Sequence, residues 1–239
     1  MILITRLSCR DNGRLLRQKY LFIIATAVSM LVMAGIANDI LPNDRTFELA
    51  RTRFGPQAAE RLKAWRNLTL SLSGTSESNK LTQVNRFFNS LPNEDDMVLW
   101  GVPDYWATPV ELLVRNAGSC HDFALAKYFT LKAVGIPEEK LRITYARVWL
   151  PQRARLETHM VLAYYPNPEA DPLILDNLMD TILPASQRTD LVPIINFNAG
   201  GLWSAKQRGQ SGRIGDITSI HHWNELLARM SEEHSGVPR

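Results

Sequence analysis

The sequence predicts an α+β domain in which N-terminal helices and a central cysteine-bearing helix pack on an antiparallel β-sheet. After residue 37 the first half of the chain has the mixed apolar and charged spacing of helices. The second half alternates in polarity and is rich in β-branched and aromatic residues separated by short polar turns. Helices followed by strands in this way are typical of α+β domains.

Residues 1–37 have the composition of a secretory leader. Five Lys and Arg residues against one Asp precede the uncharged run 20–37, which ends in small residues. We expect cleavage between Ala37 and Asn38; a retained N-terminal membrane anchor is the alternative, because the run is near the lower length limit of a membrane-spanning helix. Either reading places one domain, residues 38–239, outside the cytoplasm.

The charge of the chain depends on this leader. The full sequence has 27 basic and 24 acidic residues. Without residues 1–37, 22 basic and 23 acidic residues remain, a net charge of −1. The basic isoelectric point is therefore no indication of nucleic-acid binding, and we expect no nucleic-acid partner.

The predicted helices begin with 44–53, 56–71 and 78–90, which are interrupted by Gly-Pro and Gly-Thr pairs. An aromatic stretch, Leu91 to Trp106, is expected to be a loop. A further helix should start after Thr108, because Thr-Pro-Val-Glu has the form of a capping box with proline in its first turn.

The next helix bears Cys120. Ser119 is a suitable N-cap, and Gly135 followed by Pro137 provides the stop. The residues between them leave little polar surface, which indicates a helix buried in the middle of the domain.

The remaining elements are mostly strands. Strands are predicted over 141–150, 158–165, 172–177 and 191–198, and an amphipathic helix over about 220–233 closes the chain.

Cys120 is the one cysteine beyond the leader, so it has no partner for an internal disulfide there. In the first turn of a helix, unpaired N–H groups and the helix dipole stabilise a thiolate. A nucleophilic role is therefore favoured, although a free cysteine can also be a buried small hydrophobe.

His159 and Asp176 complete the candidate catalytic set. His159 lies in an alternating strand with Val161 and Ala163 on the same side, and a base within reach of Cys120 would deprotonate it. His121 is less suited, because adjacent helical residues do not face each other. Asp176 ends a short strand and would hold the imidazole in one tautomer; alternatively, His159 is a core histidine and Asp176 an ordinary turn residue.

Several ordered motifs resemble one family. They are Trp100-Gly101, Asp104-Tyr105-Trp106-Ala107-Thr108-Pro109-x-Glu111, Gly118-x-Cys120-x-Asp122-Phe123-x-x-Ala126-Lys127-Tyr128, Thr158-His159-Met160-Val161-Leu162, Leu175-Asp176-Asn177 and Asn198-x-x-Gly201-Leu202-Trp203. Spread over about residues 45–205, they resemble the bacterial transglutaminase-like cysteine proteinases.

The resemblance implies a papain-like/transglutaminase-like core with a Cys-His-Asp triad at Cys120, His159 and Asp176. It also implies a periplasmic endopeptidase. The implied substrate is the N-terminal region of a large secreted adhesin, cut at a paired-alanine site to release the cell from its biofilm. The implied regulator is an inner-membrane receptor that senses cyclic di-GMP.

Calcium is the cofactor that the resemblance implies, and here the sequence departs from the family. In such proteases, acidic residues on both sides of the nucleophile help to bind the ion, whereas this chain has Ser119 and His121. Asp122 remains, and Asp104 or Glu111 could contribute. Because calcium prefers several carboxylate ligands, we expect that this protein is calcium-independent or binds the ion weakly.

Two other functions stay open from the residues. A transglutaminase or amidase would form the same acyl-enzyme and pass it to a different acceptor. A non-catalytic binding module would keep the fold without the chemistry.

Overall fold

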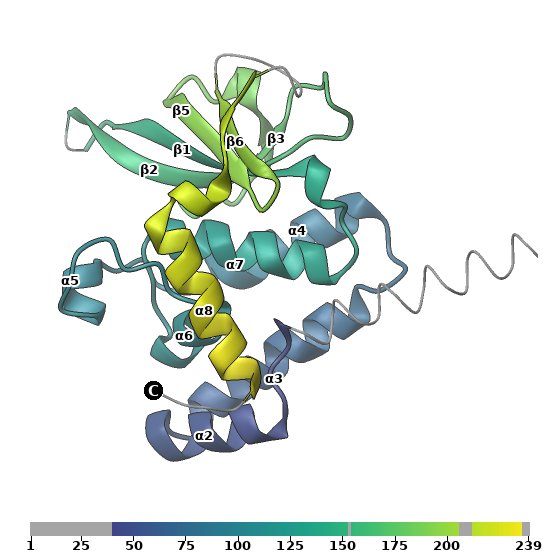
Figure 1. The fold of residues 1–239 in the computed structure, drawn as a ribbon, viewed down its shortest axis with the longest axis vertical. Helices are drawn as coiled ribbons and strands as arrows, with labels where there is room; N and C mark the ends of the chain where they lie inside the picture. The colour runs from purple at the N-terminus through teal and green to yellow at the C-terminus, as the bar shows by residue number, and fades with distance from the viewer. Residues whose placement is uncertain (1–39, 153, 206–211, 236–239) are drawn as a thin grey trace, which may run out of the picture.

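The chain builds its helices first and its sheet second, as the sequence predicts. The computed structural model describes residues 40–152, 154–205 and 212–235 (Figure 1). The predicted leader lies outside the described residues. The helices before the sheet are α2 (Asp44–Phe54), α3 (Pro56–Ser71), α4 (Glu77–Asn89), α5 (Asp96–Leu99), α6 (Pro109–Arg115) and α7 (Cys120–Ala133).

Local sequence signals set the helix ends. Gly55, with φ of 88°, takes the left-handed region between α2 and α3, where other residues would be strained. Thr108 and Glu111 form the predicted capping box at the start of α6. The predicted stop of α7 is also present, since Gly135 adopts a φ of 85° just beyond the last turn.

Seven antiparallel strands form one sheet in the order β4-β3-β2-β1-β5-β6-β7. Their bounds are β1 (Leu141–Leu150), β2 (Arg155–Tyr164), β3 (Leu173–Leu175), β4 (Leu183–Pro184), β5 (Leu191–Asn198), β6 (Gly201–Ser204) and β7 (Arg213–Gly215). Three-residue 3₁₀ turns are η1 (Glu138–Lys140), η2 (Ala185–Gln187) and η4 (Ile217–Ser219), and α8 (His221–Ser235) follows. The sequence did not predict α5, β4, β6 and β7, because elements of two to four residues are too short to show a period.

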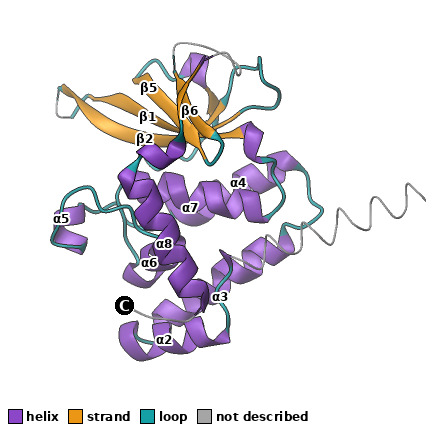
Figure 2. Ribbon diagram, in the orientation of Figure 1, coloured by secondary structure: helices purple, strands orange, loops and turns teal. Residues whose placement is uncertain are grey.

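The helices cover one face of the sheet, with α7 directly against it (Figure 2). Ile143, Met160 and Leu162 from the central strands share the main core with α7. Trp65 of α3 is fully buried on the other side of α7 and donates from its indole N–H to Thr130 Oγ1 at 2.9 Å. The predicted burial of α7 on nearly every side is therefore confirmed, and it fixes the start of this helix rigidly.

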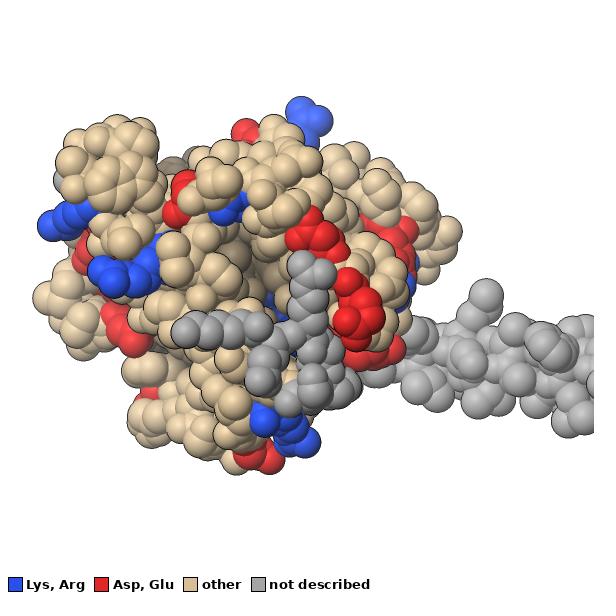
Figure 3. All heavy atoms as spheres, turned by 90° about the horizontal axis from the view of Figure 1, so that it is seen from above, with Lys and Arg blue, Asp and Glu red and all other residues tan. Residues whose placement is uncertain are grey.

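Within the described residues, no helix combines the length and the apolar character needed to cross a membrane. On the outer side of the sheet, basic and acidic groups are scattered among uncharged surface (Figure 3).

Candidate active site

Cys120 is the first residue of α7, and its backbone is held there by the residues before it. Asp122 Oδ2 accepts the N–H of Ser119 at 2.9 Å, and Asp122 Oδ1 accepts the N–H of Ala107 at 2.7 Å. A Cβ at Gly118 would approach Leu112 Cδ1 to 2.5 Å and Asp122 Oδ2 to 2.9 Å, so any side chain there would displace the residues that hold this turn. Asp122 thus acts as the helix N-terminal acid that its position suggests, and it also ties the 105–107 loop to α7.

The structure brings His159 and Asp176 together. His159 Nε2 lies 2.7 Å from Asp176 Oδ1, and both residues are buried. Strand β3 pairs with only the last part of β2, Leu162 to Tyr164. Asp176 directly follows β3 and therefore reaches the neighbouring stretch of β2 that carries His159. Because Nε2 is occupied, Nδ1 is the ring nitrogen left for Cys120.

Arg188 is a site residue that the sequence did not predict. Its guanidinium is buried and donates to Asp176 Oδ2 at 2.7 Å and to Asp190 Oδ2 at 2.7 Å. Burial raises the pKa of Asp176, but the hydrogen bonds from His159, Leu178 N–H and Arg188 outweigh it and hold the pKa well below its usual range. The sequence around Arg188 gives no sign of this role. Arg188 reaches Asp176 because the chain after β4 returns to the end of β3.

The backbone of Asp176 is anchored from α4. Asn89 donates to the Asp176 carbonyl at 2.8 Å and accepts from Lys127 Nζ of α7 at 2.6 Å. Burial lowers the pKa of Lys127 to about 7. This contact joins α4, α7 and the residues after β3, so Asp176 is fixed by both its side chain and its main chain.

The thiol of Cys120 lies between two imidazoles. Burial raises its pKa, but hydrogen bonds from His121 and His159 outweigh this and lower the pKa to about 6. Burial lowers the pKa of His159, whereas its hydrogen bonds to Asp176 and Cys120 raise the pKa to about 9. Between about pH 6 and pH 9 the pair is therefore a thiolate and an imidazolium, as nucleophilic attack requires.

The contact with His121 corrects the sequence interpretation. Adjacent residues in the middle of a helix do not face each other, but Cys120 and His121 are in the first turn. Side chains in a helix point back toward its N-terminus, and no preceding turn blocks them here. The ring of His121 turns back over the helix start, where it also contacts the Tyr105 carbonyl at 2.9 Å and hydrogen-bonds Cys120.

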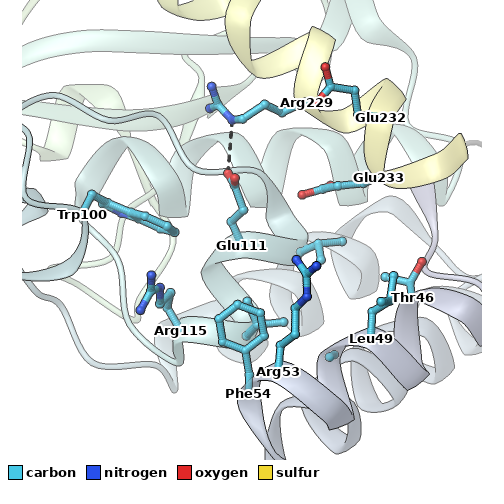
Figure 4. A pocket seen from close by; sticks show the side chains of 13 residues that line it. Thr46, Leu49, Arg53, Phe54, Trp100, Glu111, Arg115, Arg229, Glu232 and Glu233 are labelled. Atoms are coloured by element: carbon cyan, nitrogen blue, oxygen red, sulfur yellow. Dashed lines mark ion pairs between the residues drawn. The ribbon is translucent and has the colours of Figure 1, made fainter. Parts of the chain in front are cut away.

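A cleft of about 430 Å³ opens at Cys120 and His159. It is lined by Asn93, Glu94, Asp95, Ser119, Cys120, Val148, Leu150, Glu157, Thr158, His159, Asn177 and Leu178. From the aromatic stretch Leu91 to Trp106, only the polar residues Asn93 to Asp95 line this cleft. Trp100 lines a separate cavity of about 250 Å³ beside α2, α6 and α8, where Arg229 pairs with Glu111 (Figure 4).

Alkylation of Cys120 is expected to reveal its low pKa. Because only the thiolate reacts, the rate of iodoacetamide modification should rise through about pH 6, well below the range of a free thiol. His159→Gln should move the midpoint upward, since it removes one of the two imidazoles. Mass spectrometry of the modified peptide gives the rate, and His221→Gln, an exposed histidine, is the matched control. A wild-type midpoint above pH 8 would contradict the geometry.

The sequence pattern of the bacterial transglutaminase-like cysteine proteinase family matches residues 57–191, more than half of the chain. The chain belongs to the bacterial transglutaminase-like cysteine proteinases. It is therefore a cysteine peptidase with a transglutaminase-like fold. The matched region contains Cys120, His159, Asp176 and Arg188.

Solved structures of Legionella pneumophila LapG resemble this bacterial transglutaminase-like cysteine proteinase at 44% sequence identity. The EGTA-treated form has a TM-score of 0.68 and covers 78% of this chain and 96% of its own. The calcium-bound form has a TM-score of 0.66 and covers 78% and 98%. The comparison with curated proteins gives no match.

The calcium-bound relative makes calcium relevant to this member of the family. Within the described residues, one group of possible metal ligands has its ligand atoms within 4.8 Å of one another. It consists of Asp96, His121 and Asp122. Both oxygens of Asp122 already accept backbone N–H groups. Glu111 is engaged by the Thr108 N–H and the Tyr105 hydroxyl. Calcium prefers several oxygen ligands, and this group supplies two carboxylates and one imidazole.

Proposed function

We propose that this protein is a periplasmic cysteine endopeptidase that cleaves the N-terminal region of a large surface adhesin and so controls release from a biofilm. The single observation that carries the proteolytic part is the buried His159–Asp176 pair beside the Cys120 thiol at the mouth of a cleft. Family membership supports the reaction class. The adhesin and a regulatory inner-membrane receptor for cyclic di-GMP come from the sequence resemblance, and the leader at residues 1–37 is inferred from its composition.

In the proposed mechanism, the Cys120 thiolate attacks a peptide carbonyl. The C–N bond breaks as the His159 imidazolium gives its proton to the leaving amine. Water then attacks the thioester while His159 takes a proton from the water. The carboxylic acid product leaves, and the Cys120 thiolate and the His159 imidazolium are restored. Asp176 and Arg188 orient the ring throughout. The N–H groups of the first turn of α7 are suitable donors for the oxyanion.

The cleft suits an extended polypeptide. One wall is the segment Asn93 to Asp95, and the other comes from the ends of β1 and β2. Glu94, Asp95 and Glu157 line it together with the apolar Val148 and Leu150. A peptide segment with small side chains at the scissile bond could lie between these walls and reach Cys120.

Incubation with N-terminal fragments of large repeat adhesins from the same genome tests the proposal. We expect two shorter polypeptides whose masses sum to the fragment plus one water. A product cross-linked to an added amine would instead indicate acyl transfer, and an uncleaved panel together with a normally alkylated Cys120 would refute the adhesin assignment.

We also propose that catalysis here does not depend on calcium. The Ser119 hydroxyl and the His121 imidazole on the two sides of the nucleophile support this, because they stand where the resemblance implies carboxylates. Addition of EGTA is expected to change the cleavage rate of the purified protein by less than about twofold, because no ion contributes to the proposed thiolate. Complete loss of activity in EGTA, restored by calcium, would refute it.

A further inference from the structure

Four oxygen atoms converge on one nitrogen beside the nucleophile. His121 Nε2 is the centre of this group. Its neighbours, at 2.7, 2.9, 3.3 and 3.5 Å, are Ser119 Oγ, the Tyr105 carbonyl oxygen, Asp96 Oδ2 and Asp122 Oδ1. Oxygen atoms gathered in this way form the kind of cage that usually surrounds a cation. In this protein the centre of the cage is filled by the imidazole nitrogen.

The ring of His121 is held in place by its surroundings. It stacks on Trp106 with a centroid distance of 6.1 Å, and Trp106 in turn stacks on Phe197 at 5.7 Å. Both aromatic residues are buried. His121 itself is 8% exposed, so its position is defined by packing as well as by hydrogen bonds.

The atoms around His121 come from three separate parts of the chain. Asp96 belongs to α5, Tyr105 to the loop that follows it, and Ser119 and Asp122 to the start of α7. The segment before α5 forms one wall of the cleft. A single side chain therefore connects the wall of the cleft with the helix that carries the nucleophile.

Two buried carboxylates require a positive partner at this point. Asp96 is 7% exposed and Asp122 is fully buried, and the Cys120 thiolate is close by. Buried charges of one sign are costly unless they are paired. A calcium ion or a protonated side chain could supply the charge, and His121 occupies the centre.

We propose that His121 is a built-in substitute for a bound cation, which joins the α5 segment to the start of α7 and makes a metal unnecessary at this active site. His121 is thus a positioning residue. Its importance for cleavage rests on the proposed peptidase function, but the substitution of ion by imidazole can be tested without a substrate.

The test is to rebuild an acidic cage. His121→Glu alone and Ser119→Asp/His121→Glu together should convert the cluster into a calcium site, because carboxylates then surround an empty centre. By isothermal titration calorimetry, we expect the double variant to bind one calcium per chain with a Kd of about 1 mM or tighter. In EGTA its Tm should be about 5 °C lower than that of the wild type and should recover on calcium addition. The wild type should show neither response.

Each departure from this pattern is informative. Wild-type protein that binds calcium saturably, or whose Tm falls in EGTA, would overturn the proposal. Saturable binding of zinc to the wild type would also overturn it, since one imidazole and two carboxylates suit a transition metal. A folded double variant without calcium binding would show that the cage is no cation position.

His121→Gln keeps the inference testable if the acidic variants do not fold. Glutamine retains an N–H donor but carries no charge. We expect a Tm about 5 °C below that of the wild type, with no response to calcium. A Tm equal to that of the wild type would refute the proposed role, and His221→Gln, at an exposed site, is the matched control. These measurements follow metal binding and unfolding, so their outcome is independent of adhesin cleavage.

Discussion

Cys120→Ala is expected to abolish proteolysis while leaving the fold intact. Removal of the nucleophile from an acyl-transfer site typically lowers kcat by about 10⁴–10⁶-fold, because the remaining groups cannot form the acyl-enzyme. Cys120 sits at the edge of the main core and is only partly buried, so the loss of its sulfur should cost at most about 1 kcal/mol of unfolding free energy.

The measurement combines cleavage of an adhesin fragment with a thermal melt. Cys120→Ser serves as a second variant, since a hydroxyl of similar size has too high a pKa to be ionised by His159. Persistent turnover in either variant would refute the nucleophile assignment. A wild-type Cys120 that does not react with iodoacetamide at neutral pH would favour a non-catalytic module with this fold.

Asp176→Asn is expected to have the second largest effect, a fall in kcat of about 10²–10⁴-fold. The amide keeps the size of the side chain but removes the negative charge that raises the pKa of His159. At neutral pH the imidazolium should then be less populated, and the Cys120 thiolate with it. The alkylation midpoint of Cys120 should therefore move upward together with the loss of activity.

Asp190→Asn is the matched control for Asp176. Asp190 shares Arg188 with Asp176 but is more exposed and does not contact His159. The Asp190→Asn variant should leave the midpoint of Cys120 alkylation unchanged and reduce kcat only slightly. Equal losses in both variants would indicate that Arg188 and its two carboxylates act on stability, with Asp176 having no special role toward His159.

Much of the fold was predictable because its signals are local. The capping box at Thr108, the proline at the start of α3 and the glycine after α7 act within one turn of the chain, so the helix ends followed from the sequence. The β1–β2 hairpin was predictable for the same reason, since two segments rich in β-branched and aromatic residues flank a short polar turn. Its second strand begins at Arg155 rather than at the predicted residue 158, because the polar residues there pair with the end of β1. The strand β6 was not predictable, because its four residues are too few to show a strand pattern. It is recognised only by its pairing with β5.

For the candidate site, the sequence alone predicted Cys120, His159 and Asp176, because a cysteine at a helix start is followed along the chain by a histidine and an aspartate in successive strands. The contacts that tune them were not predictable. Arg188, Asn89 and Asp96 come from distant segments, and no periodicity relates them to the nucleophile. The sequence also misjudged His121, because the rule for adjacent helical residues does not hold at a helix start.

The sequence by itself determined the family and the helix-then-strand order and predicted the nucleophile, because each rests on neighbouring residues or on motifs kept in order. Only the tertiary structure decided that Arg188 contacts Asp176, that Asn93 to Asp95 form a wall of the cleft, and that His121 fills an oxygen cage. Those features depend on packing between segments far apart in the chain. This packing sets the burial of each titratable side chain and its distance to neighbouring charges, and therefore its pKa.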